Sequence, residues 1–423
     1  MARGAGRHVG RRLAGRVGRT RLMIVLAVVG PGLIAAASDN DAGGITTWSV
    51  IGSRWGYSLL WLLVLVTPIL AVTQEMGARM GAVTGKGLAA LIREKFSLRM
   101  TAFAMLALLV ANFGTTVAEF SGVAAAFGLA GAPAWVCVPP VALGVWLLVT
   151  RASFRKVERV FLVLTAVYAA YVVAGFLAQP DWAAAAHGSV RPHVSAGSVW
   201  LLTVIAAIGT TITPWGQFFI QAYVVDKRVS LKDYVYTRVE VIVGAIFTDA
   251  IDFFIVVACA ATLWESGIVV QTAQQAARAL EPIAGRAAEL LFGFGLLNVS
   301  ILGAAILPLT TAYAVCEAFG LESGLDRTWN EAPAFKGVLT AFLAVPALVA
   351  IVPGLPLVLV MLLSLDVNGV LLPIILIYVL KIINDRRVMG DHVNGTVYNV
   401  VAWTFSLALV GLSLTLVVSP FIF

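Results

Sequence analysis

Long apolar runs dominate this chain from end to end. A helix needs about 20 apolar residues to cross a bilayer, and runs of that length predict about eleven transmembrane spans. They lie near residues 22–53, 57–82, 99–129, 133–151, 156–178, 196–225, 236–263, 285–318, 336–353, 356–383 and 397–421. The first and sixth runs are too long for one plain crossing. The pattern therefore predicts an all-α polytopic membrane protein in which spans one and six are each two half-helices joined by extended backbone.

Polar residues and helix breakers interrupt three of these spans. They occupy residues 30–44 in span one, 209–217 in span six and 364–369 in span ten. Hydrocarbon offers no partner to a charge or to an open backbone group, so such stretches persist only against protein or a wet cavity. Broken helices with exposed backbone ends form ion or substrate sites near the membrane midplane. In span ten the same composition favours local unwinding.

The positions of the breaks predict an internal repeat. Spans one to five and spans six to ten each begin with a broken helix, which is typical of an inverted five-plus-five repeat. We expect a cytoplasmic arginine-rich arm over 1–21 and a first five-helix repeat over 22–178. The second, inverted repeat should cover 196–383, and 397–423 should form an eleventh transmembrane helix and an external C-terminus.

Charge sets the expected orientation. The chain is 60% hydrophobic and only 12% charged, and its first 21 residues hold seven arginines and no acid. This places the N-terminus in the cytoplasm and, with an odd number of spans, the C-terminus outside. The net charge of +7 is therefore an orientation signal, and we expect no nucleic-acid partner. The three cysteines fall inside spans and imply neither disulfides nor a thiolate metal site. No nucleophile–base pair or nucleotide motif is present, so we expect no enzyme.

A few ionisable residues lie inside predicted spans. Glu75 and Arg79 are four apart on one helical face and should pair with each other, which favours a structural role. Glu119 is a lone acid in an apolar helix and is a functional candidate. Asp249 and Asp252 share a helical face, and a cation pathway and a helix end facing water both remain open for them. Residues 85–96 are amphipathic but too short to cross, so we place them in the membrane interface.

Several motifs resemble the Nramp family of divalent-metal transporters over nearly the whole chain. They are Gly-Pro-Gly-Leu-Ile at 30–34 and the segments 77–89, 118–122, 155–158 and 384–390. The resemblance implies a LeuT-type fold and a divalent metal ion as substrate, with no cofactor. It also implies residence in the lipid bilayer of a bacterial inner membrane, and we expect a monomer.

The chain departs from the family pattern at its metal site. The family has Asp-Pro-Gly-Asn in span one where residues 41–44 read Asp-Ala-Gly-Gly, and Met-Pro-His in span six where residues 213–215 read Thr-Pro-Trp. Its span-three aspartate aligns with Thr116, while its companion Glu119 remains. Together these exchanges resemble the Nramp-related magnesium transporters, a branch that is said to move hydrated Mg²⁺ without proton coupling.

Elementary ligand chemistry also favours magnesium as the ion. A thioether favours manganese and iron over magnesium and calcium, and replacing it with the hydroxyl of Thr213 leaves only oxygen ligands. Mg²⁺ binds through one or two carboxylates and keeps several waters. The expected metal site comprises Asp41, Gly44, Thr210 (by its carbonyl), Thr213, Gln217, Asp39, Asn40 and Asp366. The pathway, or former proton route, comprises Thr116, Glu119, Trp215 and Asp252.

Other interpretations of these residues remain open. Asp39 is equally a candidate N-cap of the second half-helix, Gly43 and Gly44 also let the break form, and Trp215 fits packing better than gating. For function we expect uptake of partly hydrated Mg²⁺, and also Mn²⁺, by alternating access without proton coupling. The alternatives are a proton-coupled Mn²⁺/Fe²⁺ transporter and, with less support, a sodium-coupled organic-solute carrier of the same fold.

Overall fold

The computed structural model describes residues 40–151, 169–195, 197–229, 231, 234–280, 288–325 and 327–422. Every regular element in this part of the chain is helical. The longer helices are α2 (Ala42–Trp55), α3 (Leu60–Thr84), α5 (Leu98–Leu129), α6 (Ala134–Arg151), α10 (Ser198–Thr211), α11 (Pro214–Asp226), α12 (Tyr234–Cys259), α15 (Ala288–Phe319), α16 (Pro333–Ala350), α17 (Leu357–Ile383) and α19 (Thr396–Ile422). Shorter ones are α4 (Leu88–Lys95), α8 (Ala169–Leu177), α9 (Trp182–Val190), α13 (Ala273–Ala277) and α18 (Arg386–Met389), with short π or 3₁₀ turns at Ala260–Trp264, Arg278–Leu280 and Gly390–His392.

The transmembrane helices agree with the spans expected from the apolar pattern. Within the described residues, nine helices are long and apolar enough to cross a membrane, with the pair α10 and α11 counted as one. They match nine of the predicted spans to within a few residues. The remaining two, 22–53 and 156–178, fall partly outside the described residues, and α2 and α8 are their described parts. The arm 1–21, Asp39 and the motif 155–158 also lie outside them.

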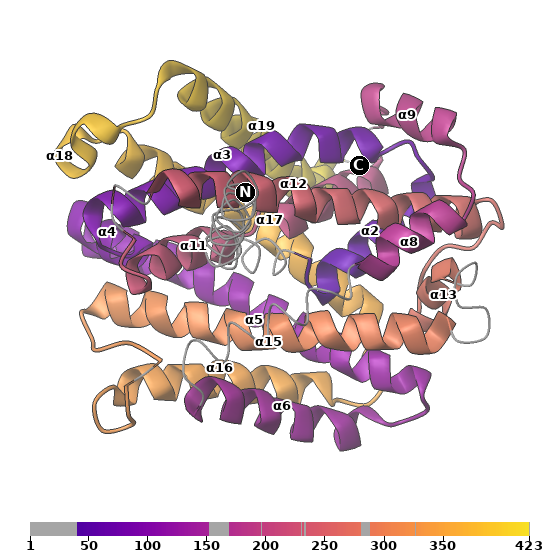
Figure 1. The fold of residues 1–423 in the computed structure, drawn as a ribbon, viewed down its shortest axis with the longest axis horizontal. Coiled ribbons are helices and arrows are strands. Elements are labelled where there is room, and N and C mark those ends of the chain that lie inside the picture. Colours follow the sequence, from indigo (N-terminus) through magenta and orange to yellow (C-terminus); the bar gives the residue numbers. More distant parts are fainter. Residues whose placement is uncertain are drawn as a thin grey trace, which may run out of the picture.

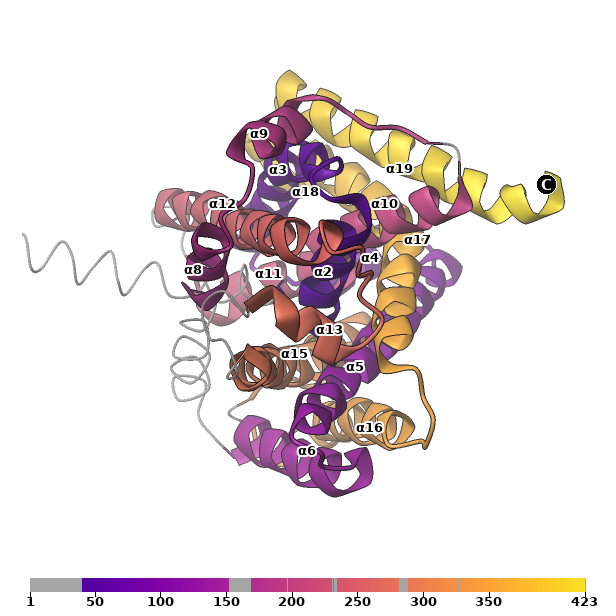
Figure 2. The same cartoon turned by 90° about the vertical axis from the view of Figure 1, so that its right-hand side faces the viewer.

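The short half-helices lie in the middle of the bundle. Helices α6 and α16 lie together on one side of the molecule and α19 lies on the opposite side, in both views (Figures 1 and 2). Helices α5 and α15 pack along each other, and α5 also packs against α17. Helix α2 contacts α10, α12 and α17. The starts of α2 and α11 are therefore enclosed by long helices, away from the lipid-facing surface.

The prediction of local unwinding in span ten was wrong, because α17 runs unbroken from Leu357 to Ile383. Its polar and small residues serve helix packing. The Asn368 side-chain amide donates to Thr115 Oγ1 of α5 at 2.9 Å. A Cβ on Gly369 would lie 2.5 Å from the Ile205 carbonyl oxygen of α10. An amide bonded across helices and a glycine at a close approach stabilise packing in a membrane bundle, and neither requires the helix to open.

The predicted pair in α3 is confirmed. Arg79 Nη2 lies 3.1 Å from Glu75 Oε2, and Tyr234 of α12 donates its hydroxyl hydrogen to the other carboxylate oxygen. Arg79 also donates to the carbonyl oxygens of His392 and Val393 and to the Asn394 side chain. These contacts tie α3 to α12 and to the segment before α19, which is the structural role expected of the pair.

The amphipathic stretch 85–96 contains the short helix α4. Lys86 pairs with Glu94 at 2.7 Å, and Lys95 pairs with Asp385 beyond the end of α17. The second pair holds α4 at the end of the bundle where α17 finishes.

Candidate metal site

The break in span six is where the sequence placed it. Helix α10 ends at Thr211 and α11 begins at Pro214, with Ile212 and Thr213 in extended backbone between them. Thr213 Oγ1 accepts a hydrogen bond from the Gly216 amide at 3.1 Å, so this hydroxyl is the N-cap of α11. Because proline has no N–H, the carbonyl oxygen of Thr210 lacks the donor that position 214 would supply in a continuous helix. The break thus leaves a backbone oxygen beside a capping hydroxyl, as predicted for span six.

The described part of span one begins at a second helix start. Asp41 is the N-cap of α2, with Oδ1 accepting from the Gly44 amide at 2.7 Å. The alternative that Asp39 caps this half-helix is therefore wrong, since the capping position belongs to Asp41. An N-cap carboxylate satisfies an amide that has no partner in the helix and lies at the positive end of the helix dipole. Gly43 and Gly44 lie in the first turn of α2, not in the break itself.

A second carboxyl meets the start of α2 from α5. Glu119 Oε2 accepts from the Ala42 amide at 3.4 Å, and its carboxyl lies next to that of Asp41. Both side chains are buried. Among the described residues no salt bridge joins either carboxyl to a lysine or arginine. Two adjacent acids in a low-dielectric interior need a cation or a proton between them.

Two buried polar side chains lie at the break in span six, Thr210 in the last turn of α10 and Gln217 in the first turn of α11. Thr210 and Gln217 are each only 1% exposed. Neither Thr210 Oγ1 nor Gln217 Oε1 has a hydrogen-bond partner within the described residues. Burying a polar oxygen without a partner costs free energy, so such atoms call for a water or a ligand. Asn40 donates its amide to the Thr248 carbonyl oxygen of α12 at 3.3 Å, which anchors the start of α2 to that helix.

Trp215 and Thr116 occupy positions where the family pattern has titratable residues. Trp215 is buried in the first turn of α11, and its ring centroid lies 6.1 Å from that of Phe219. Thr116 donates its hydroxyl to the Asn112 carbonyl oxygen of its own helix at 2.7 Å. The contacts of Trp215 fit the packing interpretation, and neither side chain changes charge near neutral pH.

Leu365 of α17 lies between the two helix breaks. A Cβ on Gly43 would come within 2.9 Å of its Cδ1, and a Cβ on Gly209 within 2.2 Å of its carbonyl oxygen. Leu365 is fully buried. One apolar side chain therefore touches the first turn of α2 while its backbone touches the last turn of α10. Sequence reasoning missed Leu365, because a leucine in an apolar span carries no signal of its own.

The other predicted residues belong to α17 and α12. Asp366, the residue after Leu365, lines a cavity of about 210 Å³ between α2, α10 and α17. Asp252 and Asp249 are buried in α12, and Asp249 faces Thr67 of α3. Within the described residues, no group of three or more His, Cys, Asp or Glu side chains could hold a metal ion. Two carboxyls and neutral oxygens are therefore what this region offers a cation.

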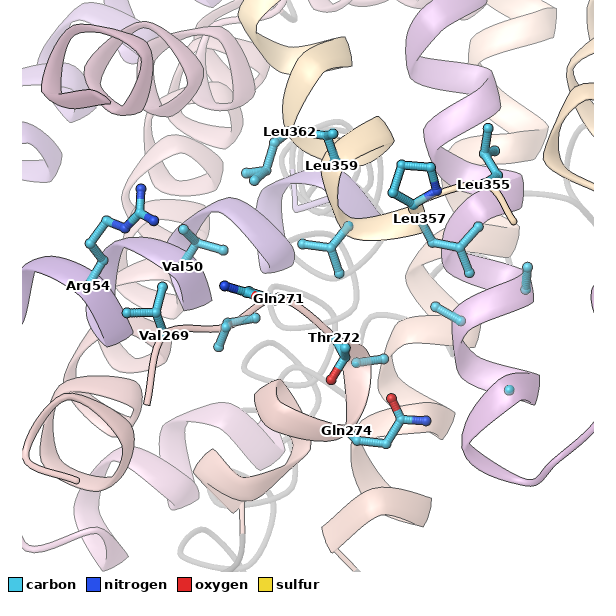
Figure 3. A pocket seen from close by; sticks show the side chains of 17 residues that line it. Val50, Arg54, Val269, Gln271, Thr272, Gln274, Leu355, Leu357, Leu359 and Leu362 are labelled. Carbon is cyan, nitrogen blue, oxygen red and sulfur yellow. The ribbon is translucent and has the colours of Figure 1, made fainter. Parts of the chain in front are cut away.

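A wider cavity adjoins the narrow one. It measures about 660 Å³ and lies between α2, α5, the segment 269–274 and the start of α17. Figure 3 shows Arg54 and Val50 of α2 on one side of it, with Gln271 and Thr272 opposite the first turns of α17. Arg54, Val50, Leu359 and Leu362 line both cavities. The two cavities therefore meet along the contact between α2 and α17.

Comparison with known proteins identifies the family. The family model for natural resistance-associated macrophage protein-like proteins, Nramp, matches residues 32–419. The chain belongs to the Nramp family. It is 29% identical to the divalent metal cation transporter MntH of Burkholderia ambifaria, over 95% of this chain and 91% of that protein. It is 30% identical to MntH of Ralstonia nicotianae, over 90% of this chain and 88% of that protein. As an Nramp protein it is a divalent metal cation transporter, with the metal as substrate and no cofactor, and not an enzyme.

Solved structures confirm the predicted fold class. The Eremococcus coleocola manganese transporter, in complex with an aromatic bis-isothiourea substituted compound, has a TM-score of 0.74 and 22% identity, covering 92% of this chain and 86% of that one. Mhp1, a nucleobase-cation-symport-1 family transporter, has a TM-score of 0.61 and 15% identity, covering 92% of this chain and 89% of that one. The Nramp chain thus has the LeuT-type arrangement expected for a multi-pass bacterial membrane transporter.

Proposed function

We propose that this Nramp protein takes up Mg²⁺, and also Mn²⁺, in partly hydrated form and without proton coupling. The observation that supports the proposal best is the set of donors at the two helix starts. Asp41 supplies one capping carboxylate with Glu119 beside it. At the break in span six, the side chains of Thr213, Thr210 and Gln217 offer neutral oxygens.

This donor set suits a small, strongly hydrated cation. Mg²⁺ usually keeps several waters and takes one or two carboxylates from the protein. Thr213 is in the place where the family pattern has a methionine, so this position contributes a hydroxyl and no soft sulfur ligand. Gly44 is in the place of an asparagine, which removes a direct ligand and leaves volume for water. Asp41 keeps the charge that attracts the ion.

The same region lacks two groups that a proton route would use. Trp215 and Thr116 are in the places of the histidine and aspartate of the family pattern, and neither can carry a proton at neutral pH. Uptake needs no proton in any case. At about 2.3 kcal/mol per charge per 100 mV, a dication entering a cell at roughly −100 mV gains about 4.6 kcal/mol. The direction of uptake rests on the predicted cytoplasmic N-terminus.

One observation favours the alternative of proton-coupled Mn²⁺ or Fe²⁺ transport. The carboxyl of Glu119 lies against that of Asp41, so a metal that binds to Asp41 would disfavour a proton on Glu119 or release one. The names of the relatives, divalent metal cation transporter and manganese transporter, agree with this alternative as well. The two acids at the helix starts argue against a sodium-coupled carrier of organic solutes.

Reconstitution in liposomes separates these functions. We expect internal Mg²⁺ and Mn²⁺ to rise, with Ca²⁺ as the third ion compared, and internal pH to stay constant while they enter. Acidification that follows metal entry would establish proton coupling. Robust Mn²⁺ flux without Mg²⁺ flux would reject magnesium as the substrate.

The role of Asp41 is tested by Asp41→Asn. Asparagine caps a helix as well as aspartate does, so α2 should form while the charge is lost, and flux should fall to the level of empty liposomes. The matched control is Asp181→Asn, because Asp181 caps the exposed helix α9 through the amides of Ala183 and Ala184. The control should transport normally. Wild-type flux through Asp41→Asn would refute the central role given to this carboxylate.

A further inference from the structure

The narrow cavity between α2, α10 and α17 is an apolar groove at the lipid-facing side of these helices. Its edges are large apolar side chains that are 37–50% exposed, namely Val199, Leu202, Leu359 and Leu363. The unpartnered oxygens in its lining, Asp366 Oδ1 and Thr47 Oγ1, have almost no accessible surface. The Thr203 hydroxyl donates to the Val199 carbonyl oxygen of its own helix at 2.7 Å. The groove therefore offers apolar surface to its contents, and its edges continue into the surface that faces the bilayer.

One cationic side chain lies at the end of this groove that is nearest the membrane surface. Arg54 is in the last turn of α2, and it shares the groove with Val199 and Leu359 in the first turns of α10 and α17. Thr47 and Asp366 lie seven residues deeper along α2 and α17, which corresponds to roughly 10 Å. Membrane-spanning helices start and end near the lipid headgroups. The arginine is therefore at headgroup level, while the apolar walls lie at the level of the acyl chains.

The charge of Arg54 is available to a ligand. Arg54 is exposed, and none of the salt bridges within the described residues involves it. A guanidinium presents a planar set of N–H donors that matches the oxygens of a phosphate group. The open end of the groove thus has the donor that an anionic headgroup requires.

The volume of the groove suits part of one acyl chain. An apolar cavity of about 150 Å³ binds a molecule of the size of benzene, and this groove measures about 210 Å³. Leaving it empty would cost its lining the dispersion contacts of a filled interior. Acyl chains are as apolar as leucine, so a chain fills the groove without favouring one lipid over another. Selectivity among lipids must come from the headgroup, and hence from Arg54.

We propose that this groove binds one anionic phospholipid, with an acyl chain between α10 and α17 and the headgroup phosphate on the Arg54 guanidinium. A zwitterionic lipid has the same phosphate, but the positive charge of its headgroup opposes that of Arg54. The bound lipid contacts α2, α10 and α17 together and so stabilises their packing. This site is independent of which metal ion the protein transports.

Lipid binding by the full-length protein in detergent tests the proposal. Phosphatidylglycerol and phosphatidylcholine with identical acyl chains are added to delipidated protein, bound lipid is counted by native mass spectrometry, and Tm is measured alongside. We expect wild type to retain one phosphatidylglycerol in preference to phosphatidylcholine and to gain Tm from it. Arg54→Gln should weaken phosphatidylglycerol binding about fivefold, because one basic residue near an anionic lipid contributes about 1 kcal/mol. The matched control is Arg191→Gln, an exposed arginine between α9 and α10 that lines neither cavity, and it should bind lipid as wild type does.

A second variant and a soluble headgroup analogue test the two halves of the site separately. Thr203→Phe places a large side chain at a half-buried position in the groove and should weaken phosphatidylglycerol binding although Arg54 is intact. Its Tm without added lipid shows whether it is folded. Glycerol phosphate should not displace the bound lipid, because it has no acyl chain.

Several results would overturn the lipid site. Equal phosphatidylglycerol binding by wild type and Arg54→Gln would exclude the arginine, and equal binding of both lipids by wild type would exclude selection by charge. Normal binding by folded Thr203→Phe would place the acyl chain outside the groove. Displacement by glycerol phosphate would indicate a site for free phosphate. None of these measurements uses metal flux, so the lipid site and the proposed function stand or fall separately.

Discussion

Gly209 sits at the tightest contact between α10 and α17, and adding one methyl group there should separate the two helices. In the Gly209→Ala variant the new Cβ would lie 2.2 Å from the Leu365 carbonyl oxygen, 2.5 Å from the Gly369 amide nitrogen and 2.9 Å from the Gly369 Cα. All three are backbone atoms, so no side-chain rotation relieves the clash. Ordinary contacts begin at 3.4 Å, and the helices must therefore move apart by about 1 Å.

The cost follows from two opposing effects. Overpacking a well-packed interior typically costs about 1–3 kcal/mol. Replacing glycine by alanine inside a helix recovers about 1 kcal/mol of that. We expect the free energy of unfolding to fall by up to about 2 kcal/mol, and the Tm in detergent to fall by roughly 1 °C per kcal/mol for a chain of this length. Leu365 lies at this contact and also packs against Gly43 in the first turn of α2. Moving α17 away from α10 would therefore disturb the start of α2, and metal flux should also fall.

Gly144→Ala is the matched control. Gly144 lies inside α6, and a Cβ there would meet no atom within 4 Å. The same substitution should therefore leave Tm unchanged or raise it slightly, with flux intact. Thermal unfolding in the same detergent compares the Tm values of the two variants. If Gly209→Ala were as stable and as active as Gly144→Ala, the close approach of α10 and α17 would not exist in the protein.

Three further predictions concern the metal, the ion pairs and pH. Thr213→Met should add a soft ligand and increase competition by Cd²⁺ against Mg²⁺ uptake; unchanged competition would place Thr213 away from the ion. Arg79→Ala leaves the buried Glu75 carboxylate without its charged partner and should cost about 3–5 kcal/mol in unfolding experiments. Lys86→Ala removes an exposed ion pair and should cost under about 1 kcal/mol; similar losses would contradict the burial argument. Asp385 accepts hydrogen bonds from a lysine of α4 and from a backbone amide, which lowers its pKa below the ordinary 3.8, so its stabilising effect is present above that value and is lost as pH falls through the lowered pKa. The Tm difference between wild type and Asp385→Asn should therefore be constant near neutral pH and shrink below about pH 4, and a difference that grows with acid would refute it.

The sequence by itself determined the spans and the site's charge. Apolar runs of membrane-spanning length have few alternatives to a helix, because hydrocarbon leaves no partner for open backbone groups. The break in span six followed from Pro214, which removes an amide that a continuous helix would need. Asp41 stood out because a carboxylate inside an apolar span persists only with a partner or a function.

Only the tertiary structure decided which polar residues serve packing and which line a cavity. Residues 364–369 looked like a third interruption, yet Asn368 bonds to Thr115 of α5 and Gly369 admits the backbone of α10. The N-cap of α2 is Asp41 and not Asp39. The position of Leu365 between Gly43 and Gly209, and the cavity that Asp366 shares with Thr47, arise from helices far apart in sequence. Local composition specifies how a segment prefers to fold, but the neighbours of a side chain depend on how the helices pack, and that is a property of the whole bundle.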